Sequence, residues 1–298
     1  MDLSALGTET RNDQTADLDR MPLPELLQVM NAEDRSVALA VRGVLPEIGA
    51  AVELITASLR QGGRLVYIGA GTSGRIGLLD AVECPPTFGT SPDQVVALLA
   101  GGRDAFAVAV EGAEDDPRAA AADLARIGAG ARDTVVGLSA SGRTPYVVGG
   151  LDHARAVGAA TVSVACNRDA VISGHADVAI EVATGPEVLT GSTRLKAGTA
   201  QKLVCNMLST ASMVRIGKVY RNLMVDVRPS NDKLVDRARR IVAEAADARP
   251  DVAARALQAA GGHAKTAIVM LLTGCDREGA AARLERSGGD VRAAVAGS

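Results

Sequence analysis

Residues 64–75 constrain the fold more than any other part of the chain, because an apolar run breaks there into glycines and then hydroxyl residues. Leu65 to Ile68 is typical of a buried strand, and the glycines after it predict a tight turn into a helix near Gly74. The N–H groups of such a turn and the positive end of the helix attract an anion, and Thr72 and Ser73 add hydroxyl donors. The sequence therefore predicts a phosphate-binding turn, and a structural turn without a ligand is the alternative.

The same glycines satisfy the G-x-G-x-x-G pattern of dinucleotide-binding folds. A dinucleotide site needs an acidic residue at the end of the second strand, about 20 residues further on. Here the second expected strand, Val95 to Ala100, ends in Gly101-Gly-Arg103, and Asp93 precedes it. We therefore expect no NAD at this turn.

A second loop of this kind follows the apolar stretch before Ser139. It reads Ser-Ala-Ser-Gly-Arg-Thr and supplies the hydroxyls of Ser139, Ser141 and Thr144. Neutral hydroxyl and N–H donors suit a phosphate monoester better than a pyrophosphate. The alternative is an ordinary helix cap, since Ser and Thr are favoured there. The two loops together resemble the sugar isomerase (SIS) family, whose S-x-S-G-x-T loop holds the phosphate of a phosphosugar.

Strand and helix signals alternate through the middle of the chain, after two or three helices between Pro24 and Leu59. Such alternation predicts an α/β fold with a doubly wound, parallel, five-stranded sheet and helices on both faces, whose ligands bind at the carboxyl ends of the strands. The expected strands are Leu65–Ile68, Val95–Ala100, Thr134–Leu138, Ala160–Ala165 and Val178–Val182.

The ends of the chain differ from this pattern. Residues 1–20 are polar and aperiodic, which by composition predicts a flexible arm. Glycine and proline breaks beyond Asn231 predict a linking helix and a small three-helix unit at about residues 250–298. We expect an N-terminal arm with helices over 1–50, a phosphosugar-binding domain over 51–222, and the linking helix with the C-terminal unit over 223–298.

The amino-acid composition argues against several classes of binding partner. The chain has 298 residues, a net charge of −3 and 2% aromatic residues, so nucleic acid has neither a basic surface nor a stacking platform to bind. Cysteines and histidines are scattered, which favours neither a metal site nor a disulfide framework. The acidic N-terminus lacks a signal-peptide layout and no apolar stretch is long enough for a bilayer, so we expect a cytoplasmic protein without a membrane partner.

Two carboxylates stand out as candidates for acid–base chemistry. Glu83 follows the first glycine loop and its helix, among apolar neighbours that would raise the pKa of a carboxyl and suit a proton donor. Glu114 lies in an acidic run, where clustered like charges would move a general base towards neutrality. Acids that stabilise a helix N-terminus are the plainer explanation of that run.

Polar residues also crowd the start of a long helix after Gly191. Ser192, Arg194 and Lys196 are placed to reach back to a ligand, although capping and solvated charge explain each of them equally well.

Several motifs together resemble the N-acetylmuramic acid 6-phosphate etherase family, bacterial lyases of cell-wall (peptidoglycan) recycling with an SIS core. The resemblance covers nearly the whole chain, and the last 50 or so residues match in helical character alone. The motifs are Thr8-Glu-Thr-Arg-Asn12, Gly69-Ala-Gly-Thr-Ser-Gly-Arg75, Glu83-Cys-Pro-Pro-Thr-Phe-Gly89, Glu111-Gly-Ala-Glu-Asp-Asp116, Ser139-Ala-Ser-Gly-Arg-Thr-Pro145 and Thr184-Gly-Pro-Glu-Val-Leu-Thr-Gly-Ser-Thr-Arg-Leu-Lys-Ala-Gly198.

The resemblance implies cleavage of a lactyl ether from a phosphosugar by β-elimination and hydration, without a cofactor, in a homodimer. It implies that Glu83 is the acid and Glu114 the base. By analogy with SIS proteins, the phosphate would rest on Ser73, Ser139, Ser141 and Thr144. That leaves Ser192, Arg194 and Lys196 as candidates for the sugar or the lactyl carboxylate. A phosphosugar isomerase and a non-catalytic sugar-phosphate sensor are the competing hypotheses.

Overall fold

The computed structural model describes residues 6–108, 110–227 and 232–297. The chain divides into two compact units, each described on its own. Unit 1 comprises Met1–Val82 and Asp93–Ser209, and unit 2 comprises Glu83–Pro92 and Thr210–Ser298.

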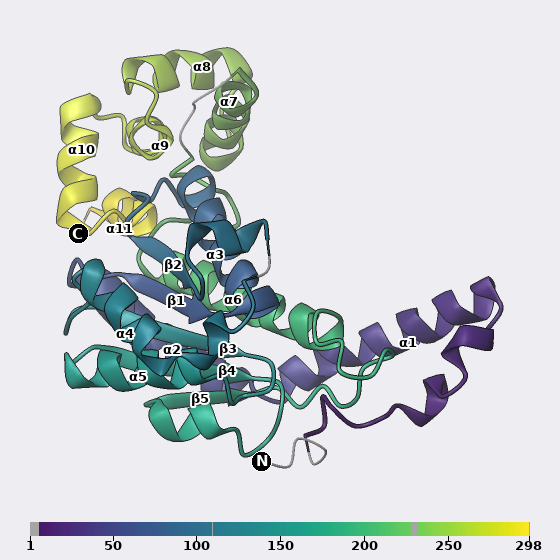
Figure 1. Ribbon diagram of the computed structural model, residues 1–298. Coiled ribbons are helices and arrows are strands. Elements are labelled where there is room, and N and C mark those ends of the chain that lie inside the picture. The colour runs from purple at the N-terminus through teal and green to yellow at the C-terminus, as the bar shows by residue number, and fades with distance from the viewer. Residues whose placement is uncertain (1–5, 109, 228–231, 298) are drawn as a thin grey trace. The chain divides into compact units, whose positions relative to one another are not determined.

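Unit 1 contains the expected five-stranded parallel sheet, in the order β2-β1-β3-β4-β5 (Figure 1). Because β2 follows β1 on one side while β3 lies on the other, the winding reverses between β1 and β3. The register pairs Gly69 at the end of β1 with Leu138 in β3. The loops after these two strands therefore meet at the topological switch point, where such sheets bind ligands. The strands are β1 (Leu65–Gly69), β2 (Val95–Leu99), β3 (Thr134–Ser139), β4 (Ala160–Ala165) and β5 (Val178–Glu181).

Helices cover both faces of this sheet. Val66 and Ile68 of β1 belong to a core cluster with residues of α4 and α5, while Tyr67 faces the opposite way, towards Gly77 of α3. This alternation along β1 is the period of two that a strand buried on both faces requires. The helices are α1 (Leu23–Arg42), α2 (Leu45–Arg60), α4 (Pro117–Arg126) and α5 (Pro145–Ala156), with α3 (Gly71–Phe88) and α6 (Lys196–Arg215) running from unit 1 into unit 2.

The N-terminal segment is packed from residue 6 to residue 15, where Leu6, Thr8, Asn12 and Thr15 are buried, so the expected flexible arm is wrong for this part, whereas residues 16–20 are mostly exposed. Thr8 is fully buried and Asn12 is 7% exposed. The Asn12 side chain accepts the N–H of Gln14 and caps a short 3₁₀ turn. Composition misled here because tertiary hydrogen bonds, rather than apolar periodicity, hold the segment. Residues 1–5 of the predicted arm lie outside the described residues.

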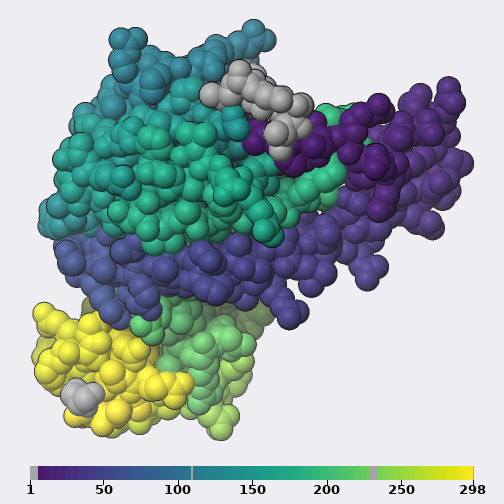
Figure 2. All heavy atoms as spheres, turned by 90° about the horizontal axis from the view of Figure 1, so that it is seen from below, coloured from purple at the N-terminus to yellow at the C-terminus, as the bar shows by residue number. Residues whose placement is uncertain are grey.

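The helix α1 projects beyond the sheet of unit 1, as its purple ribbon and spheres show (Figures 1 and 2). Of its residues, Val37 and Val41 are the buried ones. Leu23, Leu27 and Leu39 are between 56% and 67% exposed. This helix therefore presents apolar side chains that the described part of the chain leaves exposed.

Unit 2 is built on a helical core of small apolar residues, among them Ala253, Ala267 and Ala280. Its helices are α7 (Asp232–Ala246), α8 (Pro250–Ala259), α9 (Ala264–Thr273), α10 (Arg277–Arg286) and α11 (Val291–Ala296). The segment from residue 250 onwards thus forms four helices rather than the expected three, because Asp290 caps a further short helix after Gly289. Within the described ranges, no helix is both long and apolar enough to cross a membrane.

Candidate functional site

The loop after β1 depends on close backbone packing. Gly71 has a φ of 52°, a conformation that glycine adopts without strain, and α3 begins there, three residues before the expected start at Gly74. A Cβ at Gly74 would lie 2.6 Å from the carbonyl oxygen of Gly69. The two glycines therefore allow the first turn of α3 to fold back on the end of β1.

Ser73 is anchored rather than open to solvent. It is 7% exposed, and its hydroxyl donates a 2.8 Å hydrogen bond to Oε1 of Gln201. Gln201, buried on α6, is a residue that sequence reasoning missed, since a lone glutamine in a helix carries no motif signal. The Ser73 proton is thus committed to α6, and only its lone pairs remain for other partners.

The loop after β3 gathers the three predicted hydroxyls. The Ser139 Oγ lies 2.8 Å from the Thr144 Oγ1 and 3.4 Å from the Ser141 Oγ, and it accepts the Gly142 N–H at 3.0 Å. Thr144 occupies the N-cap position of α5 without making a capping hydrogen bond. The cap explanation therefore does not account for Thr144, whose hydroxyl turns towards Ser139 instead.

Asn167 ties this loop to the N-terminal segment. Its Nδ2 donates to the Thr8 Oγ1 at 2.9 Å and to the Ala140 carbonyl at 3.2 Å, and its Oδ1 accepts the Thr8 N–H at 3.2 Å. Asn167 was missed because it stands alone after β4. The Thr8 motif, which composition alone placed in a flexible arm, supports the loop after β3.

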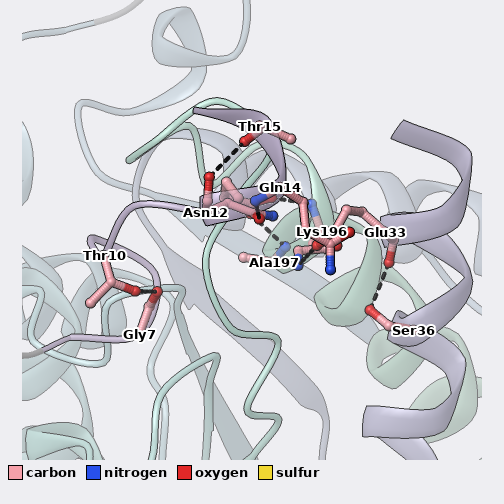
Figure 3. Close-up of polar contacts among 10 residues, drawn as sticks. Gly7, Thr10, Asn12, Gln14, Thr15, Glu33, Ser36, Lys196 and Ala197 are labelled. Atoms are coloured by element: carbon pink, nitrogen blue, oxygen red, sulfur yellow. Dashed lines mark hydrogen bonds and ion pairs between the residues drawn. The ribbon is translucent and has the colours of Figure 1, made fainter. Parts of the chain in front are cut away.

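The start of α6 is held by two carboxylates, the buried one of Glu187 and the half-buried one of Glu33. Glu187 is fully buried and accepts the N–H groups of Lys196 at 2.9 Å and Ala197 at 3.0 Å. Burial raises the pKa of Glu187, and these two hydrogen bonds offset part of that rise. Lys196 is 3% exposed, and its Nζ pairs with the carboxylate of Glu33 on α1 (Figure 3). Glu187, which sequence reasoning left without a role, is the cap of α6.

Ser192 is half-buried and Arg194 is exposed, just before this helix. A Cβ at Gly198 would lie 3.6 Å from Cγ2 of Thr72. The first turn of α6 therefore packs against the loop after β1.

Glu114 lines a cavity of about 190 Å³ in unit 1, together with Gly71 and Arg75. Arg75 donates to the carbonyls of Ala105 and Phe106 at 2.8 and 2.9 Å and so fixes the 3₁₀ turn that follows β2. The acidic residues of the run 111–116 differ in what they do. Asp116 caps α4, whereas Glu114 is exposed on the preceding 3₁₀ turn. The helix-terminus explanation thus accounts for Asp116 and leaves Glu114 facing the cavity.

Glu83 lies within α3 and not after it, because the helix continues through Pro85 and Pro86 to Phe88. Cys84 takes the buried position, and both Glu83 and Val82 are exposed. Glu83 is therefore open to solvent in the part of the chain that the structure describes. Among the described residues, no group of three or more His, Cys, Asp or Glu could hold a metal ion.

Together with two family models, the five-stranded parallel sheet and the hydroxyl-rich loops at its switch point identify a sugar isomerase (SIS) domain protein. The family model of the glucokinase regulatory protein N-terminal SIS domain matches residues 47–155, and that of the SIS domain matches residues 118–211. The fold is similar to a putative phosphosugar isomerase from Bacteroides fragilis, with a TM-score of 0.50 and 22% identity over 66% of this chain and 94% of that one.

Full-length relatives narrow the class to one family. A protein from Mycolicibacterium smegmatis is 74% identical over 99% of both chains, and one from Exiguobacterium is 60% identical over 98% of this chain and all of its own. A third, from Geobacillus, is 59% identical over 98% of this chain and 99% of its own. All three are named N-acetylmuramic acid 6-phosphate etherase, and the chain belongs to this family of enzymes.

Proposed function

We propose that the chain cleaves the D-lactyl ether of N-acetylmuramic acid 6-phosphate with water, giving N-acetylglucosamine 6-phosphate and D-lactate. The observation that carries the proposal is the cluster of Ser139, Ser141 and Thr144 hydroxyls at the sheet's switch point, in a chain 74% identical to a relative of that name. Such neutral donors suit the 6-phosphate of an amino sugar.

In this proposal Ser139, Ser141 and Thr144 contact the phosphate directly. Ser73 shares the site from the loop after β1, but its proton goes to Gln201, so it would have to turn to donate to the ligand. Lys196 is already paired with Glu33, whereas Arg194 is exposed. Arg194 is therefore the preferred candidate for the lactyl carboxylate, with Ser192 beside it and Lys196 holding the helix start.

The proposed reaction is a β-elimination followed by hydration, which makes the enzyme a carbon–oxygen lyase. In the ring-opened aldehyde the C2 proton is acidic, and Glu114 takes it as general base. The electron pair forms the C2–C3 double bond, the C3–O bond breaks, and Glu83 gives its proton to the departing lactate oxygen. Water then adds across the double bond. Two carboxylates acting in opposite senses need no cofactor.

We also propose a homodimer in which a second copy covers α1. The exposed leucines Leu23, Leu27 and Leu39 on a helix that projects from unit 1 support this occupant. Leu79 and Val82, which are 47% and 55% exposed on the helix that carries Glu83, would also be shielded if the site lies near that interface. The test is the mass in solution: the wild type should be dimeric and Leu27→Glu with Leu39→Glu monomeric, and a monomeric wild type would refute it.

We also propose that this activity is cytoplasmic and serves cell-wall recycling, because the proposed substrate is a phosphorylated sugar. The deciding experiment is lactate release from N-acetylmuramic acid 6-phosphate by purified, chelator-treated protein. Lactate release supports the etherase without a metal requirement. Turnover of fructose 6-phosphate without lactate would instead indicate a phosphosugar isomerase, and binding without turnover would indicate a sugar-phosphate sensor.

A further inference from the structure

Unit 2 contains two similar two-helix segments in succession. α8 begins at Pro250 and α10 at Arg277, while α9 begins at Ala264 and α11 at Val291, so both pairs are offset by 27 residues. At this offset the segments are identical at Ala253/Ala280, Ala254/Ala281, Leu257/Leu284, Gly261/Gly288, Gly262/Gly289 and Ala267/Ala294.

The two copies also share their turn geometry. Gly261 and Gly288 have φ values of 67° and 62°, and Gly262 and Gly289 both have 83°. The second glycine of each turn donates its N–H five residues back, to the carbonyl of Leu257 at 2.9 Å in one copy and of Leu284 at 2.7 Å in the other. Agreement in sequence, offset and backbone conformation indicates an internal duplication of one helical hairpin, the kind of unit that buries its apolar face against its neighbour.

One cationic side chain from each hairpin contacts the segment between α6 and α7. This segment, residues 217–227, is called the connector. Lys265 and Arg292 occupy equivalent positions, the second residue of α9 and of α11. The Lys265 Nζ lies 2.7 Å from Oδ2 of Asp226, and the Arg292 guanidinium lies 5.7 Å from the ring centre of Tyr220. Both contacts end on the connector, so the duplicated hairpins hold it at two points.

The Asp226 contact is the more enclosed of the two. The side chains of Lys265 and Asp226 are 9% and 17% exposed, and Lys218 also pairs with Asp226, at 3.0 Å. A partly buried carboxylate between two ammonium groups is held more firmly than an exposed ion pair.

The connector in turn meets the end of α3. Gly89 has a φ of 64°, and its N–H closes the helix on the carbonyl of Pro85. A Cβ at residue 89 would lie 2.3 Å from the carbonyl oxygen of Asp226, so only glycine allows this approach. Glu83 lies on the same helix, less than two turns before Gly89.

We propose that the duplicated hairpins position Glu83, with Lys265 and Arg292 holding the connector and Asp226 fixing the end of α3. Lys265 is thus a positioning residue for the reaction, and the inference rests on the proposed function. A small displacement of an acid from its substrate oxygen slows proton transfer without altering the groups that bind phosphate.

The test compares two rates in Lys265→Met: lactate release, which needs the acid, and exchange of the substrate's C2 proton in D₂O, which needs only the base. We expect kcat for lactate release to fall by about tenfold to a hundredfold. The KM should change by less than about twofold and C2 exchange should persist, because the phosphate loops and Glu114 belong to unit 1. Lys265→Arg should recover most of the release. Arg255→Gln is the matched control, since this exposed cation of the first hairpin pairs with Asp251.

Arg292→Gln is a second test variant, needed because Lys265 is buried and Lys265→Met can fail to fold. Arg292 is exposed, so its substitution should leave the fold intact. Arg292→Gln should show the same separation of release from exchange, with a smaller effect. The inference would be overturned if Arg292→Gln and folded Lys265→Met both released lactate and exchanged the C2 proton at wild-type rates. It would also be overturned if lactate release and C2 exchange fell by equal factors. If Lys265→Met does not fold, a normal Arg292→Gln overturns it alone. A wild type without lactate release would instead refute the proposed function, and this inference with it.

Discussion

The buried carboxyl of Asp80 makes the stability of unit 1 depend on pH. Asp80 lies on α3, is 9% exposed, and accepts hydrogen bonds from the Tyr67 hydroxyl at 2.9 Å and the Ser209 hydroxyl at 3.0 Å. Burial raises the pKa of Asp80, the two hydrogen bonds and the charge of Lys202 offset only part of the rise, and the resulting pKa is about 6. Folding therefore favours the protonated form of this side chain.

The change in the free energy of unfolding follows from the difference between the folded and unfolded pKa values of Asp80. An unperturbed aspartate titrates near pH 3.9, so the difference of about 2 units corresponds to about 3 kcal/mol. Because the folded-state pKa is raised, this stability is fully present below about pH 4 and is lost as the pH rises through 6. Asp80→Asn stays neutral, keeps an acceptor for Ser209, and lets the Tyr67 hydroxyl turn to the Cys205 carbonyl, 3.4 Å away.

We expect Asp80→Asn to be more stable than the wild type by up to about 3 kcal/mol at pH 8 and nearly equal to it at pH 4. Urea unfolding of both proteins across this range measures the difference, with the exposed Asp104→Asn as control. A difference that does not change with pH, or that favours the wild type at pH 8, would refute the reasoning.

Three further predictions concern the turns and the site. Gly89→Ala should lower the free energy of unfolding by about 2 kcal/mol or more, because position 89 has a left-handed backbone and a Cβ there would clash with a carbonyl oxygen. The control Gly49→Ala has open space around it and should stay within about 1 kcal/mol of wild type. Equal shifts in the melting temperatures of the two variants would contradict this. Ser139→Ala should raise the KM for the sugar phosphate about tenfold and lower the free energy of unfolding by about 1 kcal/mol, because the buried hydroxyl also holds Thr144 and the Gly142 N–H. Steady-state kinetics showing an unchanged KM would exclude Ser139 from the phosphate site. Burial alone would raise the pKa of Asp133, but the hydrogen bonds and charge of Arg64 hold this pKa below its usual range. Asp133→Asn should therefore lower the free energy of unfolding by about 2 kcal/mol at neutral pH, and by progressively less as the pH falls below about 4. A loss of stability that does not depend on pH would contradict this.

The sheet and both hydroxyl loops could be predicted from the sequence because their signals are local. Leu65 to Ile68 is apolar and is followed at once by its turn glycines, and the Ser139 loop follows the same rule. The end of α3 could not be predicted in this way. Pro85 and Pro86 are read as helix breakers, yet the helix continues through them to close on Gly89.

The residues that sequence reasoning missed act over long separations. Thr8 and Asn167 are 159 positions apart, and Ser73 and Gln201 are 128 apart. A single side chain gives no signal for a partner that only the fold brings close. The duplicated hairpins are different, because the repeated Gly-Gly pairs at Gly261 and Gly288 are visible in the sequence to a search for internal repeats.

The most direct test of the central claim, that two carboxylates play opposite roles on one phosphosugar, is C2 proton exchange measured beside lactate release in D₂O. Glu83→Gln should exchange the C2 proton and release no lactate, and Glu114→Gln should do neither. Lactate release at the wild-type rate by Glu83→Gln, or wild-type exchange by Glu114→Gln, would contradict the account.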